Sequence, residues 1–115
     1  MEWKHLKEEE ELNAIKDSSN SRTFVIFKHS TRCSISSTAL NRLERSWGKN
    51  EMENVEPYYL DLITYRNISN KIAELFGVQH QSPQVLVIKD GKCIYHESHL
   101  GIQYDEVKVS CSALN

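Results

Sequence analysis

The chain has 115 residues with 14 basic and 16 acidic side chains, which gives a formal net charge of -2. This length suits one domain whose core needs no disulfide or metal. The balanced charge argues against a protein built mainly to bind nucleic acid or an anionic membrane. The longest apolar runs, residues 24–27 and 85–88, are far shorter than the about 20 residues of a membrane helix. We therefore expect one soluble domain over residues 1–115.

The first residues and the cysteines bear on the compartment. Four consecutive glutamates occupy positions 8–11, and the segment lacks the apolar stretch of a secretory signal. Cys33, Cys93 and Cys111 are odd in number and widely spaced, which does not predict a disulfide framework. We expect a cytoplasmic protein whose cysteine chemistry uses single thiols.

The first half of the chain predicts a helix, a strand and a second helix. Leu6, Leu12 and Ile15 form a sparse apolar face that predicts a helix over residues 3–16. Residues 23–28 are β-branched and aromatic and predict a strand covered on both faces. The helical pattern after Cys33 is the strongest in the sequence, and Gly48 predicts its end. Its apolar positions recur every four residues: Ile35, Ala39, Leu43 and Trp47.

The second half predicts two further core strands and their connections. Residues 55–62 predict a strand, and a helix that Gly77 ends follows it. The apolar stripe of this helix consists of Ile68, Ile72, Leu75 and Phe76. Residues 84–89 predict a buried strand, and Asp90-Gly91 is the turn to a return strand over 92–97. Tyr104, Val107, Cys111 and Leu114 have the spacing of a final helix, while Val107-Lys108-Val109 also suits a strand.

The order of these elements predicts an α/β fold. A strand–helix–strand unit crosses over right-handedly and makes its strands parallel, whereas the hairpin makes the last pair antiparallel. The expected architecture is a four-stranded mixed sheet flanked by helices.

Cys33 is the candidate reactive residue, because it stands where the first strand gives way to the strongest helix. Unpaired backbone N–H groups and the positive end of the helix dipole favour the thiolate at such a position. Arg32 and Lys28 are cations that could add to this stabilisation. The alternative is that Cys33 is a small packed hydrophobe, as free cysteines often are.

The sequence around Cys33 resembles a known family. Residues 25–36 read Val-Ile-Phe-Lys-His-Ser-Thr-Arg-Cys-Ser-Ile-Ser, and His-Gln-Ser-Pro-Gln occupies 80–84. Together these segments resemble the YtxJ family of monothiol bacilliredoxins, which implies a thioredoxin-like fold. The resemblance extends from the N-terminal helix to the final hairpin. Family members carry Cys-Pro-Ile-Ser at the active site, and Ser34 replaces that proline here.

The resemblance implies a thiol–disulfide oxidoreductase that removes bacillithiol from S-bacillithiolated client proteins. Ser36 stands where a dithiol thioredoxin has its resolving cysteine, and serine cannot attack a disulfide. Cys33 would then hold the adduct as a mixed disulfide until free bacillithiol or a bacillithiol disulfide reductase releases it. Bacillithiol would be a co-substrate, and no bound cofactor is expected. The residues themselves do not distinguish bacillithiol from glutathione, coenzyme A or cysteine.

Ser82 and Pro83 are the candidate docking residues. The resemblance implies a cis-proline opposite Cys33, and only X–Pro bonds adopt cis at modest cost. A cis bond would present the backbone N–H and C=O of Ser82 to a bound chain. The alternative is an ordinary proline at the start of a strand.

Two histidines flank these segments. His29 and His80 could form a pair near the thiol, with His80 activating Cys33, or His29 could end its strand with a polar contact. Together with Cys33 they supply too few ligands for a metal ion, so no metal site is expected. Cys93 and Cys111 are expected to be packing or surface thiols.

Two other functions remain open. One is a carrier that holds an iron–sulfur cluster, as monothiol glutaredoxins do; those proteins share Cys-x-x-Ser but have glycine after the cysteine, where this chain has Ser34. The other is a redox-inert interaction module on the same fold.

Overall fold

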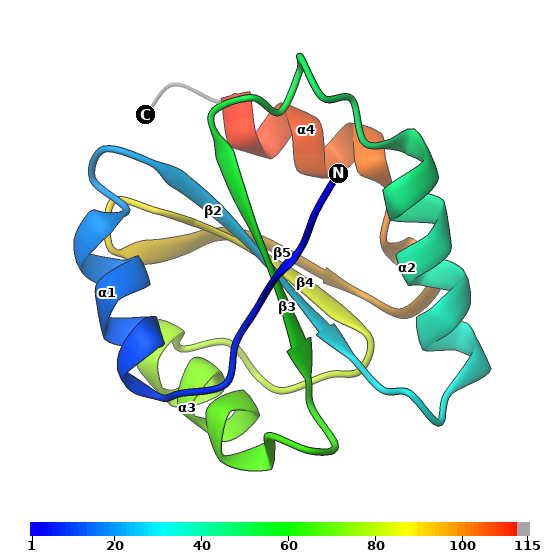
Figure 1. Cartoon of the computed structure of the whole chain (residues 1–115), viewed down its shortest axis with the longest axis horizontal. Helices are drawn as coiled ribbons and strands as arrows, with labels where there is room; N and C mark the ends of the chain where they lie inside the picture. Colours follow the sequence, from blue (N-terminus) through cyan, green and yellow to red (C-terminus); the bar gives the residue numbers. More distant parts are fainter. Residues whose placement is uncertain (113–115) are drawn as a thin grey trace.

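A five-stranded mixed sheet forms the centre of the molecule (Figure 1). The computed structural model describes residues 1–112. The strands are β1 (Lys4–His5), β2 (Thr23–His29), β3 (Val55–Asp61), β4 (Gln84–Lys89) and β5 (Lys92–Ser98). Their order in the sheet is β1-β3-β2-β4-β5. The first three are parallel to one another, while β4 is antiparallel to β2 and to β5.

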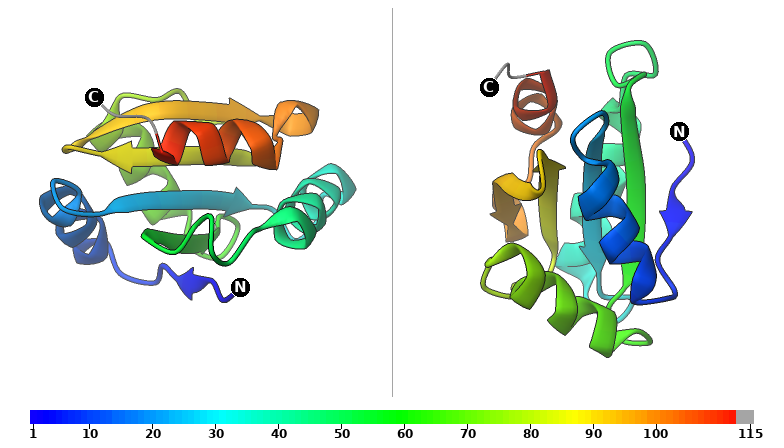
Figure 2. Two further views of the ribbon diagram at one scale, coloured as in Figure 1. Left: turned by 90° about the horizontal axis from the view of Figure 1, so that it is seen from above. Right: turned by 90° about the vertical axis from the view of Figure 1, so that its left-hand side faces the viewer.

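Helices cover both faces of this sheet (Figure 2). The helices are α1 (Glu10–Ser18), α2 (Ser34–Ser46), α3 (Arg66–Phe76) and α4 (Tyr104–Ser112), with a short 3-10 helix, η1 (His99–Gly101). Buried residues of α1 and α3 share one hydrophobic cluster, and those of α2 and α4 share the other. None of the helices in residues 1–112 is long and apolar enough to cross a membrane.

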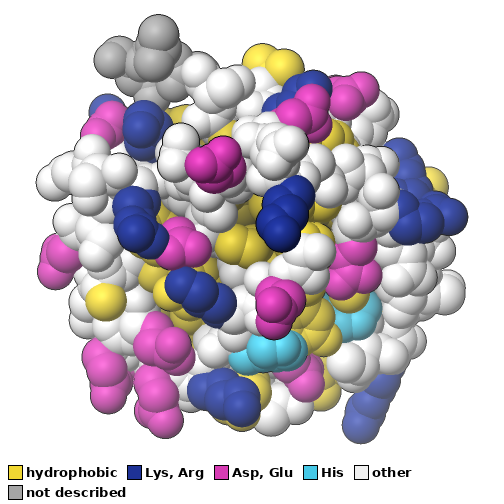
Figure 3. Space-filling view, turned by 45° about the horizontal axis from the view of Figure 1, so that its top comes forward, with side chains coloured by type: hydrophobic (Ala, Val, Ile, Leu, Met, Phe, Trp, Pro, Cys, Tyr) yellow, Lys and Arg dark blue, Asp and Glu magenta, His cyan; other side chains and the backbone are white. Residues whose placement is uncertain are grey.

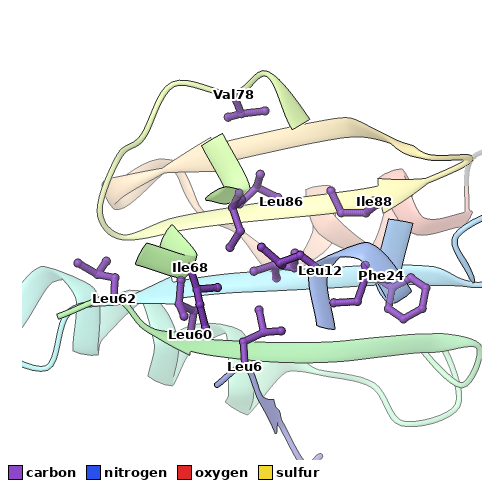
Figure 4. Close-up of a cluster of buried hydrophobic side chains, with 12 residues drawn as sticks. Leu6, Leu12, Phe24, Leu60, Leu62, Ile68, Val78, Leu86 and Ile88 are labelled. Atoms are coloured by element: carbon purple, nitrogen blue, oxygen red, sulfur yellow. The ribbon is translucent and has the colours of Figure 1, made fainter. Parts of the chain in front are cut away.

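Strand β2 contributes to both clusters, which explains its uninterrupted apolar run. Successive side chains of a strand point to opposite faces. Phe24 (Figure 4) and Ile26 accordingly pack toward α1 and α3, and Val25 and Phe27 pack toward α2 and α4. The α/β architecture is confirmed, as are the roles predicted for Gly77 and for the Asp90-Gly91 turn. Gly77 ends α3 in the left-handed conformation at φ 65°, and Asp90 and Gly91 have the positive φ values of a hairpin turn.

The predicted helix over residues 3–16 is wrong in its first half. Lys4 and His5 pair with β3, and the Leu6 amide donates to the carbonyl of Tyr59 at 2.9 Å. Helix α1 therefore begins only at Glu10, and the sheet has five strands instead of four. Leu6 is buried, as predicted, but the backbone around it pairs with the sheet edge.

At the start of α2, the residue that faces the core is not the one that the apolar spacing predicts. Ile35 is 43% exposed, whereas Ser36 is fully buried together with Ala39 and Leu43. The helix ends at Ser46, two residues before Gly48. The last helix is confirmed over Tyr104–Ser112, while Leu114 lies outside the described residues.

Candidate functional site

Cys33 is the N-cap residue of α2, at the junction that the sequence predicts. Its backbone is extended, with φ -116° and ψ 119°, and its side chain is partly exposed. Its amide donates to the carbonyl of Ser30 at 3.2 Å, and its carbonyl accepts from the amide of Ser37 at 3.1 Å. A tight turn thus carries the chain from β2 into α2, and the Cys33 side chain makes no capping hydrogen bond to the first helical turn.

Ser36 stabilises this turn through its side-chain hydroxyl. Its hydroxyl accepts a hydrogen bond from the amide of Ser30 at 3.0 Å and lies 2.7 Å from Nδ1 of His29. Both side chains are buried, and burial lowers the pKa of His29 despite the opposing effect of Asp61 and Glu44. The Ser36 hydroxyl can donate to Nδ1 of His29 or accept from it, depending on which nitrogen of the neutral imidazole carries the proton. The polar contact predicted for His29 is therefore confirmed.

We expect Ser36→Ala to destabilise the protein by about 2 kcal/mol, because the Ser30 amide and His29 Nδ1 lose a buried partner. Urea unfolding measures the loss. Ser34→Ala is the matched control, since Ser34 lies in the same helical turn and is exposed; its expected effect is below about 0.5 kcal/mol. Equal stability of the two variants would show that the hydroxyl of Ser36 is dispensable.

The segment that precedes β4 lies at the end of the sheet where β2 terminates, because β4 runs antiparallel to β2. Its Ser82–Pro83 peptide is cis. The carbonyl of Pro83 accepts from the amide of His99 at 3.0 Å, and η1 packs against α2. Segment 82–83, η1 and the helix that carries Cys33 are therefore gathered together. Arg32 and Ser34 are exposed on either side of Cys33, and Ser82 is half-buried.

His29 and His80 do not form a pair, which was one of the two alternatives that the sequence left open. His29 contacts Ser36 of α2, whereas Nδ1 of His80 lies 3.2 Å from Nζ of Lys28 and 3.2 Å from Oγ of Ser69 in α3. The reason is the alternation of strand β2: residues 27 and 29 face α2, and residue 28 faces α3. The two histidines consequently stand on opposite faces of the sheet.

Lys28 is an unusual member of this region because it is fully buried. Its Nζ donates to the carbonyl of Ser69 at 3.2 Å. Burial lowers the pKa of its ammonium to about 8. The predicted contribution of Lys28 to the Cys33 thiolate overlooked this position. The signal was available, since a lysine inside a strand buried on both faces must point into a core.

The other two cysteines are free and partly buried. The thiol of Cys93 donates to the carbonyl of Tyr95 at 3.2 Å, and burial raises its pKa. Burial also raises the pKa of Cys111, to about 12. Both thiols therefore stay protonated near neutral pH. Within residues 1–112, no three His, Cys, Asp or Glu side chains are grouped so that they could hold a metal ion.

Comparisons with known proteins agree on the fold and the family. A structure described as a proposed oxidoreductase with a thioredoxin fold superposes with a TM-score of 0.78 at 23% identity, covering 92% of this chain and 90% of that one. Thioredoxin from Fasciola hepatica gives 0.71 at 17% identity, covering 95% and 96%. Thioredoxin from Trypanosoma brucei brucei gives 0.73 at 16% identity, covering 95% and 87%. These structures share the thioredoxin fold with this chain.

The family assignment comes from the sequence itself. The family described as monothiol bacilliredoxin BrxC matches residues 4–107, which include the strand before Cys33, the Cys33-x-x-Ser36 turn and the Ser82–Pro83 segment. The chain therefore belongs to the monothiol bacilliredoxin family, whose members are thiol redox proteins.

Proposed function

We propose that this protein removes bacillithiol from S-bacillithiolated proteins in the cytoplasm, as a YtxJ-type bacilliredoxin. Cys33 thiolate attacks the bacillithiol sulfur of the client's mixed disulfide. The bonding electron pair of that disulfide passes to the client sulfur, which leaves as a thiolate. Cys33 then carries the bacillithiol until a second bacillithiol molecule, or a bacillithiol disulfide reductase, releases it.

The observation that carries this proposal is the single thiol at the start of α2. Cys33 is free and partly exposed, and the position one helical turn later holds the buried hydroxyl of Ser36. Cys93 lies on β5 and Cys111 on α4, and both thiols stay protonated near neutral pH. An adduct on Cys33 would therefore wait for an external thiol, which is monothiol chemistry.

Intact-mass spectrometry tests the proposal directly. The reduced protein is mixed with a bacillithiolated client and, in parallel, with the same client carrying glutathione. We expect the client to lose its adduct and Cys33 to gain one bacillithiol, with slower transfer of glutathione. If several bacillithiolated clients keep their adducts, the oxidoreductase proposal fails. Equal rates with both thiols would remove the preference for bacillithiol and leave general thiol exchange.

Client docking should use the exposed apolar side chains of α2, which carries Cys33 at its N-cap, and of η1, which packs against α2. Ile35 follows the cysteine on α2, and Leu100, which is 60% exposed, lies on η1 where this short helix packs against α2. On the face drawn in Figure 3, acidic and basic side chains are interspersed, in line with the balanced charge.

We expect Leu100→Ser to raise KM for a protein client about tenfold, since burial of a leucine at an interface contributes about 1.5–3 kcal/mol. Its rate with a small disulfide should stay unchanged, because such a substrate does not reach η1. Val109→Ser is the control, as Val109 is equally exposed but lies on α4. A KM unchanged in Leu100→Ser would place the docking surface elsewhere.

A further inference from the structure

We propose that the outer edge of β5 binds the same edge of a second copy of this chain, so that two five-stranded sheets join into one. Strand β5 is the last strand of the sheet (Figure 2), and no strand in residues 1–112 pairs with its outer edge. The two copies of β5 run antiparallel, with a two-fold axis between Ile94 and Tyr95. This inference goes beyond the proposed function, because it concerns the assembly of the protein and not the exchange at Cys33.

The outer edge of β5 is a row of open backbone groups. The strand has seven residues, and among the described residues no amide of 92–97 donates to a backbone carbonyl outside the ladder with β4. Such an edge is a template for another strand, so proteins usually protect it. The opposite edge is protected in this way. Strand β1 pairs with only two residues of β3, and the part of β3 before them contains Pro57, which has no amide hydrogen.

A β-bulge gives β5 a symmetrical order of faces. Cys93 and Tyr95 are paired with consecutive residues of β4, so Ile94 between them is an insertion in the ladder. Ile94 and Tyr95 consequently both pack toward α2 and α4, whereas Cys93 packs toward α1 and α3. Counted outward from the midpoint of Ile94 and Tyr95 in either direction, successive residues face α2 and α4, then α1 and α3, then α2 and α4 again.

This order permits one particular register between two copies. Residues directly opposite each other in an antiparallel pair stand on the same face of the sheet. Two identical regular strands therefore cannot pair about an axis between adjacent residues, because such neighbours face opposite sides. The insertion removes this restriction in β5. Ile94 then lies opposite Tyr95 of the second copy, and Lys92 lies opposite Glu97 of the second copy, with both members of each pair on the face of α2 and α4.

The charges of β5 are complementary in this register. Lys92 lies opposite Lys89 in its own hairpin, and neither Lys92 nor Glu97 forms an ion pair within residues 1–112. In the dimer each Lys92 meets Glu97 of the other copy, so one ion pair stands on each side of the axis. Oε1 of Glu97 accepts from the amide of Ser98 at 2.9 Å, and Oε2 is the atom that would meet the ammonium.

The backbone and the apolar side chains fit the same register. The two-residue turn before β5 fixes its alternation, in which Cys93 and His96 direct their amides and carbonyls away from β4. Cys93 lies opposite His96 of the second copy, so these groups can exchange the hydrogen bonds of an antiparallel pair. At the axis, the half-buried side chains of Ile94 and Tyr95 form two aliphatic–aromatic pairs across the strands.

Sedimentation velocity of the reduced full chain tests the dimer. Two strand edges form a small interface, so we expect a monomer at about 5 µM and mostly dimer at about 500 µM. Lys92→Glu and Glu97→Lys each place like charges opposite each other and should raise the dimer dissociation constant at least about tenfold. A 1:1 mixture of these two variants restores both ion pairs and should dimerise again. Lys49→Glu, an exposed change between α2 and β3, is the control and should have no effect.

A monomer at every concentration overturns the proposal, and so does a dimer that neither charge variant weakens. A mixture of the two variants that stays monomeric also overturns it, because Lys92 and Glu97 would then not face each other.

A cross-link tests the register without altering these charges. In Cys33→Ser/His96→Cys, the thiol of Cys93 lies opposite the new thiol at position 96 of the second copy. The Cα atoms of such a hydrogen-bonded pair are about 5.5 Å apart, which suits a disulfide. Mild oxidation should therefore give a covalent dimer whose linked peptides join positions 93 and 96, while Cys33→Ser alone should stay monomeric under denaturing conditions. Absence of this linkage would overturn the proposed register.

Discussion

Cys33→Ser is expected to reduce transfer of bacillithiol from a client to the uncatalysed background, and removal of the other two thiols should leave it nearly unchanged. Cys33 alone stands at a helix N-terminus, where it is free and partly exposed. Cys93 and Cys111 stay protonated near neutral pH, because burial raises their pKa values. Stopped-flow mixing followed by acid quench and mass spectrometry gives the transfer rate for each variant.

The matched control is the double variant Cys93→Ala/Cys111→Ala. It should keep at least about half of the rate, because each change removes only one sulfur from a partly buried position. Circular dichroism checks that each variant is folded. A folded double variant that accepts bacillithiol but no longer releases it would identify one of these cysteines as a resolving thiol and contradict the monothiol mechanism.

The central strands could be predicted because the apolar runs in their own sequences identify them. Strand β4 has the predicted bounds, and Gly77 ends α3 where the left-handed conformation requires glycine. Strand β1 carried no such signal. It consists of two exposed residues, Lys4 and His5, and its pairing depends on the neighbouring edge of β3. A contact that a distant strand determines leaves no pattern in local sequence.

The position of the reactive cysteine was predictable, but its surroundings were less so. A strand followed by a helix was enough to place Cys33 at the junction. The environment of Ser36 was missed because the apolar spacing favoured Ile35 as the inward residue, whereas buried hydrogen bonds to His29 and Ser30 hold the serine inside. Hydrogen bonds that close a turn outweigh the burial of one isoleucine there, and composition does not reveal them.

Strand β2 places residues that are adjacent in sequence on opposite faces of the sheet. His29 and Lys28 are adjacent, yet one reaches α2 and the other reaches α3 and His80. Alternation along a strand predicts this separation once the strand is assigned. The interpretation of a histidine pair failed because it relied on His29 and His80 flanking the Cys33 and Ser82–Pro83 segments and ignored the face of the sheet.

Lys28→Met is expected to raise the free energy of unfolding at pH 7 by about 2–3 kcal/mol. The pKa of Lys28 is about 8 in the folded protein and 10.5 in its ordinary state, a gap that corresponds to about 3 kcal/mol. Methionine has a similar length and no charge to bury. The change leaves no polar atom that contacts Lys28 without a hydrogen-bond partner. Nδ1 of His80 keeps the Ser69 hydroxyl as its partner, and the Ser69 carbonyl lies within the backbone hydrogen bonds of α3.

The gain in stability should depend on pH in a defined direction. Below pH 8 both the folded and the unfolded chain carry the Lys28 proton, so the native protein bears the full cost of the buried charge. Between pH 8 and 10.5 the folded state releases this proton while the unfolded state retains it, and the native protein gains stability relative to Lys28→Met. The difference should therefore shrink as pH rises through this window. Urea unfolding from pH 6 to 10 measures it, with Lys89→Met as the lysine control.

A stabilising Lys28→Met would also bear on why this lysine is kept in the core. Substitutions that stabilise a protein often do so at functional sites, where a strained or charged group is kept for its activity. Higher stability combined with slower transfer of bacillithiol from a client would show that the buried ammonium costs stability and contributes to the reaction. Unchanged or lower stability at pH 7 would show that Ser69 and His80 compensate the charge fully, so that Lys28 would need no functional reason to be buried.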